Sequence, residues 1–249
     1  MYARLLDMGM VNVLRSQSIY HAIASGMKND SEPALIILRP ETSYLSFNTE
    51  PENEGLEQQF LTDNDIPQIN RKIAAGNFYH DPNQLLLMFV FSNSRCDHFG
   101  SNESMANLTQ AVILAFNKLG VTVKYNPDNR FYAGSKEIGM ASLGLYNNTF
   151  SFFSALNLDK SVIDQSLLNS KLLPGNIITS VAEELGKVPS LEGSAEALLS
   201  SFEEIFDLAL IPSMPMPEEM DLIYDWDAKL INNKKIKQKN LQNSSGLKN

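Results

Sequence analysis

The sequence predicts an α+β fold in which helices pack on a mixed, largely antiparallel sheet. The stretch QLLLMFVF at residues 84–91 is a continuous apolar run of strand length, which is typical of a strand buried on both faces. Residues 101–120 instead have apolar side chains at helical spacing. Strands and helices are interspersed without the regular βαβ repeat of a parallel sheet, which indicates that most strand pairs are antiparallel.

The first third of the chain predicts a helix followed by strands. Residues 16–27 have apolar side chains at helical spacing, and Ser16 is the expected N-cap. The apolar run at 34–40 ends in a proline, and residues 43–48 alternate between apolar and polar side chains, so both segments predict strands. Residues 55–70 predict a short helix, a turn and a strand.

The middle of the chain continues with a helix and a group of strands. The helix at 101–120 is expected to be capped by Ser101 or Asn102 and to end at Gly120. Residues 121–126 predict a strand, and the stretch that follows predicts two or three more strands joined by tight turns.

Two further helices and a break complete the chain. Asp159 is expected to cap the first of these helices, and residues 194–210 form the second. Three prolines then interrupt regular structure, so we expect a core domain at 1–210 and an extension at 211–249. The extension is basic near its end, and we expect it to be disordered from about residue 232.

Composition excludes several classes of protein. The 249 residues are 43% hydrophobic and 20% charged, as in an ordinary soluble globular protein, and no apolar run has the length of a bilayer-spanning helix. The start lacks the basic and apolar segments of a secretory signal, so a cytoplasmic location is expected. The net charge of −9 argues against general affinity for nucleic acid. The single cysteine, Cys96, excludes an internal disulfide and a multi-cysteine zinc site.

Two short stretches carry a resemblance to a known family. The first, INRKIAAGNFYHD, occupies residues 69–81, and the second, AGSKEIGMA, occupies residues 133–141. Together they resemble the two motifs of the lipoate–protein ligase A family, within the biotin/lipoate ligase superfamily. The first motif is matched at Arg71, Gly76, Tyr79, His80 and Asp81, and the second at Gly134, Lys136, Gly139 and Ala141. The similarity extends in family order over roughly residues 4–210.

The resemblance implies a fold and a chemistry. The fold would be that of a biotin/lipoate ligase catalytic domain, spanning residues 1–210. The activity would use ATP, with Mg²⁺, to convert lipoate or octanoate to an acyl-adenylate, and then transfer the acyl group to a lysine of a lipoyl carrier domain. The carrier would be an E2 or a glycine-cleavage H-type protein. An accessory ligase subunit is a further possible partner.

The resemblance also assigns roles to residues. Lys136 would be the catalytic cation, facing an apolar cleft beside residues 74–77 and stabilising negative charge as it develops. Arg71 would be a second donor, and His80 and Asp81 would lie by the nucleotide, the aspartate acting through Mg²⁺. The complete set of expected substrate- or nucleotide-binding residues is Arg71, Ala74, Ala75, Gly76, Asn77, Tyr79, His80, Asp81, Asp128, Asn129, Gly134, Gly139 and Ala141. Without the resemblance, Lys136 would be interpreted as an ordinary solvated lysine in a turn, and Arg71 as the partner of an acidic neighbour.

The first motif departs from the family pattern. The three glycines of the family fall on Ala74, Ala75 and Gly76, and the first arginine of its pair falls on Asn70. Alanine at positive φ costs about 1–2 kcal/mol, so the two alanines either keep negative φ or narrow the pocket. We interpret this loop first as a retuned ligand loop and second as a relic of one.

Two alternative functions remain open. The departures from the motif favour a non-catalytic binding module for a lipoyl domain or acyl chain, or a partner subunit of a ligase. A cysteine-dependent octanoyltransferase would need Cys96 as its nucleophile, with His98 as its base. The second is less favoured, because members of such a catalytic group usually come from separate segments. His21 and His98 lie outside both motifs and are interpreted as surface or ordinary helix residues.

Overall fold

The structure is a computed structural model that describes residues 1–48, 61–73, 77–99, 105–162 and 177–245, with side chains described as far as Ile231. Its centre is an eight-stranded sheet in the order β11-β1-β2-β6-β10-β9-β8-β7. The strands are β1 (Tyr2–Val11), β2 (Ala34–Pro40), β6 (Gln84–Ser92), β7 (Lys124–Asn126), β8 (Arg130–Ala133), β9 (Lys136–Tyr146), β10 (Thr149–Asn157) and β11 (Ala209–Pro212). β1 pairs in parallel with β2 and β11, and the other pairs are antiparallel, which confirms the predicted fold class.

A second, three-stranded sheet lies beside one face of the first. It has the order β4-β3-β5 and consists of β3 (Tyr44–Phe47), β4 (Gln68–Asn70) and β5 (Asn77–His80). The predicted ligand loop therefore starts at the end of β4 and continues into β5. The predicted strands at 34–40, 43–48 and 84–91 are confirmed as β2, β3 and β6, and β6 lies at the centre of the large sheet.

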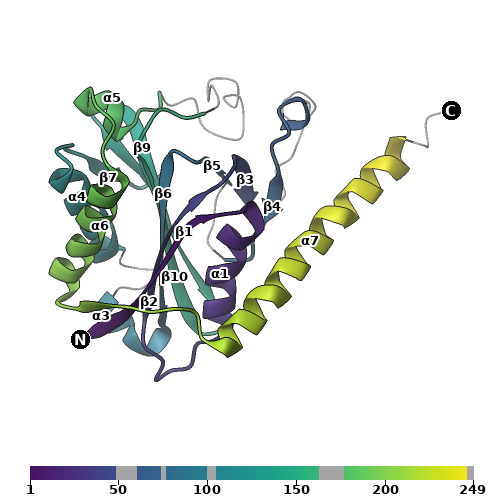
Figure 1. The fold of residues 1–249 in the computed structure, drawn as a ribbon, viewed down its shortest axis with the longest axis horizontal. Helices are drawn as coiled ribbons and strands as arrows, with labels where there is room; N and C mark the ends of the chain where they lie inside the picture. The colour runs from purple at the N-terminus through teal and green to yellow at the C-terminus, as the bar shows by residue number, and fades with distance from the viewer. Residues whose placement is uncertain (49–60, 74–76, 100–104, 163–176, 246–249) are drawn as a thin grey trace.

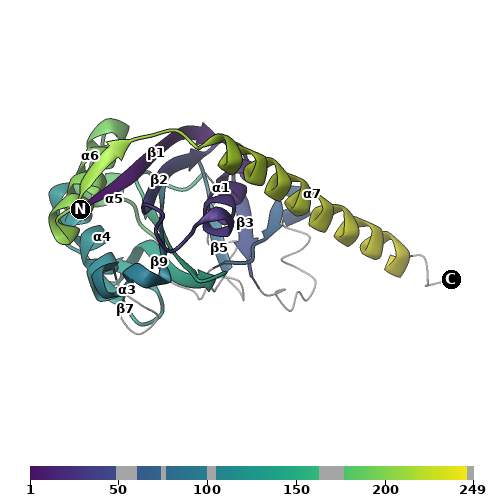
Figure 2. The same ribbon diagram turned by 90° about the horizontal axis from the view of Figure 1, so that it is seen from below.

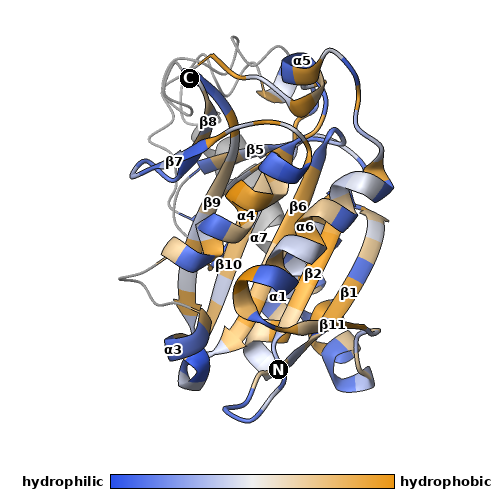
Figure 3. Cartoon of the chain, turned by 90° about the vertical axis from the view of Figure 1, so that its left-hand side faces the viewer, coloured by the Kyte–Doolittle hydropathy of each residue, from blue (hydrophilic) through white to orange (hydrophobic). Residues whose placement is uncertain are grey.

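Helices cover both faces of the large sheet (Figures 1 and 2). They are α1 (Val13–Gly26), α3 (Cys96–Phe99), α4 (Ala106–Lys118), α5 (Val181–Leu185), α6 (Leu191–Phe206) and α7 (Pro217–Ser245), with a 3₁₀ turn η1 at Asn93–Arg95. α4 and α6 bury one apolar cluster of the sheet, whereas α1 and α7 bury the cluster on the other face. Figure 3 shows the apolar strands running beneath α4 and α6. None of the described helices is long and apolar enough to span a membrane.

Several helix boundaries differ from the prediction. α1 is capped by Asn12, whose side chain accepts a bond from the Arg15 amide, so the expected Ser16 cap is wrong. Ser16 instead donates its hydroxyl to the Val13 carbonyl within the helix. Gly120, with φ of +94°, ends α4 as predicted. The predicted caps Ser101 and Asn102 lie outside the described residues, as does most of the helix predicted after Asp159.

The C-terminal extension is more regular than predicted. The boundary expected at residue 210 falls inside β11, which pairs with β1 at the edge of the sheet. After the proline-rich turn, Ile223, Trp226 and Leu230 are buried at helical spacing and attach α7 to the body of the protein. The helix continues to Ser245, through the region expected to be disordered from about residue 232.

Candidate active site

The core of the candidate site is the buried guanidinium of Arg71. The Arg71 backbone amide donates to the Phe47 carbonyl, and this bond extends the ladder of the small sheet by one residue. Arg71 is only 2% exposed. The guanidinium donates to the Ser46 hydroxyl at 2.9 Å and lies over the Phe78 ring, 4.4 Å from its centroid. Burial lowers the pKa of Arg71 from its ordinary value. A cation retained in the core fits the expected role of Arg71 as a donor.

A chain of hydrogen bonds leads away from Arg71 across the site. Ser46 bonds to His80 Nε2 at 3.0 Å, and His80 Nδ1 lies 3.4 Å from the Gln84 side-chain oxygen. Gln84 then donates to the Asn157 side chain at 3.0 Å. His80 is fully buried, and burial, assisted by the charge of Arg71, lowers its pKa to about 3. His80 is therefore a neutral link within the site.

Phe78 fills the space beside this chain. Its ring stacks on Phe153 with 6.1 Å between centroids, and Arg130 lies 5.4 Å from the Phe78 centroid. The cavity that remains is about 20 Å³, enough for one water molecule, whereas small-molecule sites typically enclose about 300–1,000 Å³. It is lined by Phe78, Tyr79, Gln84, Arg130, Glu137, Gly139, Met140 and Asn157. This cavity, as the described side chains line it, is therefore too small by itself to hold a fatty chain.

Lys136 does not lie in this cavity. Its ammonium binds the Glu184 carboxylate of α5 at 2.9 Å, and its side chain is 47% exposed. The same Glu184 oxygen accepts a bond from the Thr179 hydroxyl, and these two bonds lower the pKa of Glu184. In the described part of the chain the Lys136 ammonium therefore faces Glu184 rather than this cavity. Its expected place in an apolar cleft beside residues 74–77 stays a prediction, because residues 74–76 lie outside the described residues.

A bulge in β9 explains the position of Lys136. Phe131 pairs with Gly139, but Tyr132 pairs with Glu137, so β9 has one extra residue at Ile138. Alternate residues of a regular strand share a face, and an unbroken β9 would put Lys136 on the side of Met140.

The extra residue moves Glu137 to the side of Met140. Glu137 and Met140 line the cavity, whereas Ile138 belongs to the core cluster under α4 and α6. Glu137 forms an ion pair with Arg130 at 3.4 Å, and both side chains are nearly buried. An acid thus occupies the side of β9 where the resemblance predicted a cation.

Asp81 binds protein groups with both oxygens. Oδ1 accepts the Asn83 amide at 2.8 Å, and Oδ2 accepts the Ser161 hydroxyl at 2.6 Å and the Val162 amide at 3.2 Å. Burial raises the pKa of Asp81 from its ordinary value. Among the residues that the structure describes, no cluster of three or more histidine, cysteine, aspartate or glutamate side chains could hold a metal ion. Mg²⁺ is usually bound by only one or two carboxylates together with substrate phosphates, so the Mg²⁺ that the resemblance implies stays a prediction.

Three other predicted site residues form hydrogen bonds with neighbouring side chains. Asp128 and Asn129 form the turn between β7 and β8, where they accept the hydroxyls of Tyr132 and Tyr125 at 2.6 and 2.7 Å. Tyr79 is buried and donates its hydroxyl to Ser43. These contacts give all three predicted residues structural partners in the described part of the chain.

The two glycines of the second motif, Gly134 and Gly139, are required by the backbone geometry of β9 and of the turn before it. A Cβ on Gly139 would lie 2.6 Å from the Ala155 carbonyl oxygen, so β9 and β10 approach too closely there for a side chain. Gly134 has φ of +61° in the turn before β9. Ala141 is fully buried in the cluster under α4 and α6, on the opposite face from the cavity. Asn77 begins β5, and Ala74, Ala75 and Gly76 lie outside the described residues.

The sequence interpretation missed four residues of the site. Arg130 lies just before the second motif and Glu137 lies within it. The signal for Glu137 was a Lys-Glu pair on a strand, of which only one member can face inward. Gln84 and Asn157 end the polar chain, and no pattern in the sequence indicated their proximity. His21, interpreted as a surface or ordinary helix residue, does lie in a helix, α1, but it is fully buried rather than at the surface.

Comparisons with known proteins agree with this architecture. The model of the lipoyl protein ligase A/B catalytic domain matches residues 12–203. No curated protein matches the sequence. A lipoate-protein ligase A bound with ATP is 18% identical, with a TM-score of 0.79 over 92% of this chain and 95% of that one.

Two further solved structures share the fold at low identity. A bi-partite lipoate protein ligase from Thermoplasma acidophilum, described with its E2 lipoyl domain, is 16% identical with a TM-score of 0.75, covering 92% of this chain and 93% of that one. LipL1 of P. falciparum in complex with lipoate is 12% identical with a TM-score of 0.65, covering 90% and 73%. Identities this low establish the fold, and the family model establishes membership. The chain belongs to the lipoyl protein ligase A/B catalytic domain family.

Proposed function

We propose that the protein is a non-catalytic member of its family, which binds a lipoyl carrier domain without converting lipoate to an adenylate. The observation that carries this proposal is the exchange of charge on β9. Lys136 binds Glu184 outside the cavity, and Glu137 lies inside it. Glu137, paired with Arg130, supplies no positive charge there, whereas a fixed cation would stabilise the negative charge that develops in adenylation.

The packing around Phe78 supports the same proposal. Phe78, Phe153 and Met140 belong to one buried apolar cluster, and Phe78 packs against Arg71. Opening a chain-sized space would require separating buried aromatic rings, each of which contributes roughly 1.5–3 kcal/mol by its burial. The carrier domain as partner is proposed from family membership and from the E2 lipoyl domain described with the Thermoplasma acidophilum relative.

Two measurements on the purified protein test the proposal. The first mixes the protein with ATP, Mg²⁺ and lipoate or octanoate and follows the acyl-adenylate by mass spectrometry, with and without a lipoyl carrier domain. The second titrates the carrier domain into the protein by calorimetry without ATP. We expect carrier binding and no adenylate. Adenylate formation would overturn the non-catalytic assignment, and absence of carrier binding would overturn the assigned partner.

The second candidate is an ATP-dependent lipoate or octanoate ligase, which the buried Arg71 favours. A desolvated guanidinium at the start of the 74–76 segment is suited to a carboxylate or phosphate. This candidate requires β9 to lose its bulge, so that Lys136 replaces Glu137 on the side of the cavity. Adenylate formation that the Lys136→Ala variant abolishes, and Lys160→Ala leaves intact, would establish it.

The geometry disfavours acyl transfer through Cys96. This residue follows the far end of β6 from Gln84, and eight strand residues span about 25 Å. Cys96 also packs against the cluster under α4 and α6, on the opposite face of the sheet from Arg71 and Phe78. A nucleophile at that position would not reach an acyl group beside Arg71.

A further inference from the structure

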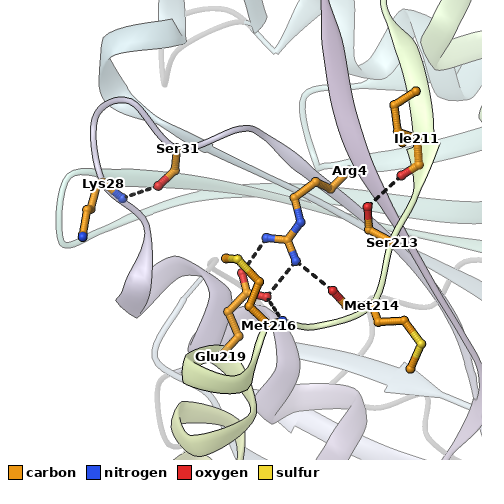
Figure 4. Close-up of polar contacts among 8 residues, drawn as sticks. All are labelled: Arg4, Lys28, Ser31, Ile211, Ser213, Met214, Met216 and Glu219. Atoms are coloured by element: carbon orange, nitrogen blue, oxygen red, sulfur yellow. Dashed lines mark hydrogen bonds and ion pairs between the residues drawn. The ribbon is translucent and has the colours of Figure 1, made fainter.

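A partly buried ion pair connects the start of α7 to β1. Figure 4 shows the guanidinium of Arg4 facing Glu219 in the first turn of the helix, with nitrogen–oxygen distances of 2.6 and 2.7 Å. Arg4 also donates to the Met214 carbonyl, and Glu219 accepts the Met216 amide at 2.7 Å. Paired bonds of this kind fix direction as well as distance. The helix therefore leaves the sheet at a defined angle.

Farther along, α7 contacts a histidine that bonds to the ligand loop. The Trp226 ring lies 4.7 Å from the His21 ring, and its Nε1–H donates to Ser25 at 3.0 Å. His21 Nε2 lies 3.0 Å from the Lys72 amide nitrogen, next to Arg71. Because an amide can only donate, Nε2 must be unprotonated. His21 Nδ1 then carries the proton and donates to the Gln17 carbonyl at 2.6 Å.

A second contact from α7 reaches the other side of the same segment. Leu230 is 2% exposed and forms a small apolar cluster with Tyr44 of β3 and Ile69 of β4. Ile73, at the other end of the segment, is buried in the same cluster as Trp226. α7 thus packs near Ile69 through Leu230, and it reaches the residue after Arg71 through Trp226 and His21.

We propose that α7 is a positioning element for the segment that carries Arg71, acting through Trp226 and His21 on the Lys72 amide. Phe47, Ser46 and Phe78 contact Arg71 directly, and α7 adds a restraint on the next residue through the Lys72 amide. The ring of Trp226 restrains the His21 imidazole, and the imidazole in turn supplies the acceptor that holds the Lys72 amide. Trp226 and His21 are positioning residues, whatever ligand Arg71 binds.

Amide hydrogen exchange of the full chain, measured by NMR, tests this proposal without any ligand. In Trp226→Ala we expect the Lys72 amide to exchange at least tenfold faster than in the unmodified protein. The ¹⁵N shift of His21 Nε2 should also change, because the ring is no longer restrained. The Phe152 amide in β10 serves as the internal reference for any global loss of stability. Tyr224→Ala is the matched control, an exposed aromatic side chain two residues earlier on the same helix.

Two results would overturn the proposal. One is a Lys72 exchange rate in Trp226→Ala equal to that in Tyr224→Ala. The other is an acceleration at Lys72 no larger than that at Phe152, which would mean that α7 contributes only to global stability. If Trp226→Ala fails to fold, Trp226→Leu keeps an apolar side chain at this position but removes both the ring over His21 and the bond to Ser25. That variant should still accelerate exchange at Lys72 more than at Phe152, and equal rates would reject the proposal.

Discussion

The segments around Arg71 and Lys136 carry the two motif matches, yet their cations lie in opposite environments. Arg71 is 2% exposed, bonds to Ser46 and covers the Phe78 ring. Lys136 has a side chain that is 47% exposed and pairs with Glu184 outside the cavity. The difference shows that a matched motif residue keeps its expected place only where the local backbone keeps its register. One extra residue in β9 was enough to turn the lysine outward.

The largest expected effect concerns the buried histidines of the Arg71 region and depends on pH. Burial lowers the pKa of His21 and of His80 to about 3, whereas unfolded histidine titrates near 6.5. The unfolded chain therefore binds more protons below that value, and stability must fall as the pH decreases. Each histidine should lower the free energy of unfolding by about 2 kcal/mol between pH 7 and pH 5, or the two together by about 4 kcal/mol.

Urea denaturation at pH 7 and pH 5 measures this loss. His80→Gln should reduce the loss by about half, because one of the two titrating groups is gone. The same loss in His80→Gln as in the unmodified protein would contradict the buried, neutral state of His80.

The next effect is expected from removing the buried cation. Arg71→Ala deletes a side chain that packs on Phe78 and bonds to Ser46, so the free energy of unfolding should fall by about 2–4 kcal/mol. Arg71→Met retains most of the packing volume and should lose less. Chemical denaturation of both variants measures the difference. Equal losses in the two variants would mean that packing on Phe78 contributes little.

A somewhat smaller effect is expected on the Lys136 side, at the close approach of β9 and β10. The Cβ of Gly139→Ala would meet the Ala155 carbonyl oxygen, and the shift of backbone needed should cost about 1–3 kcal/mol. Gly134→Asn is the control, since asparagine tolerates positive φ and no atom lies within 4 Å of the added Cβ. Thermal unfolding of both variants tests this, and a stable Gly139→Ala would contradict the strand spacing.

The smallest effect is expected from Lys136 itself. An exposed ion pair typically contributes about 0–1 kcal/mol, so Lys136→Ala should lower the free energy of unfolding by less than about 1 kcal/mol. The decrease should be smaller still at high salt. Denaturation at two salt concentrations measures both values. A loss comparable to that of Arg71→Ala would show that Lys136 is buried and would remove the contrast between the two segments.

The sequence predicted the architecture well because its signals are local. The apolar run that forms β6 and the turn at Gly120 are both set by neighbouring residues, and both are confirmed. The family motif also singled out the Arg71 segment, whose role as a binding site stays a prediction.

Which side chains of β9 face the cavity could not be predicted in the same way. The bulge at Ile138 depends on how β9 pairs with β8, and no residue type within the motif indicates a bulge at that position. The burial of His21 depends on Trp226, which is 205 residues away in the sequence and was assigned to an extension outside the core. Long-range packing therefore decided the features that distinguish this site from the family pattern.

NMR signals of the terminal methylene groups of Lys136 report the surroundings of this side chain. They test most directly whether the Lys136 ammonium lies beside Glu184, outside the cavity. We predict that Glu184→Gln shifts these signals and that Phe78→Leu, which removes the aromatic ring of the cavity, leaves them unchanged. The opposite result would place the Lys136 ammonium beside Phe78, on the same side of β9 as Arg71, and would contradict the account.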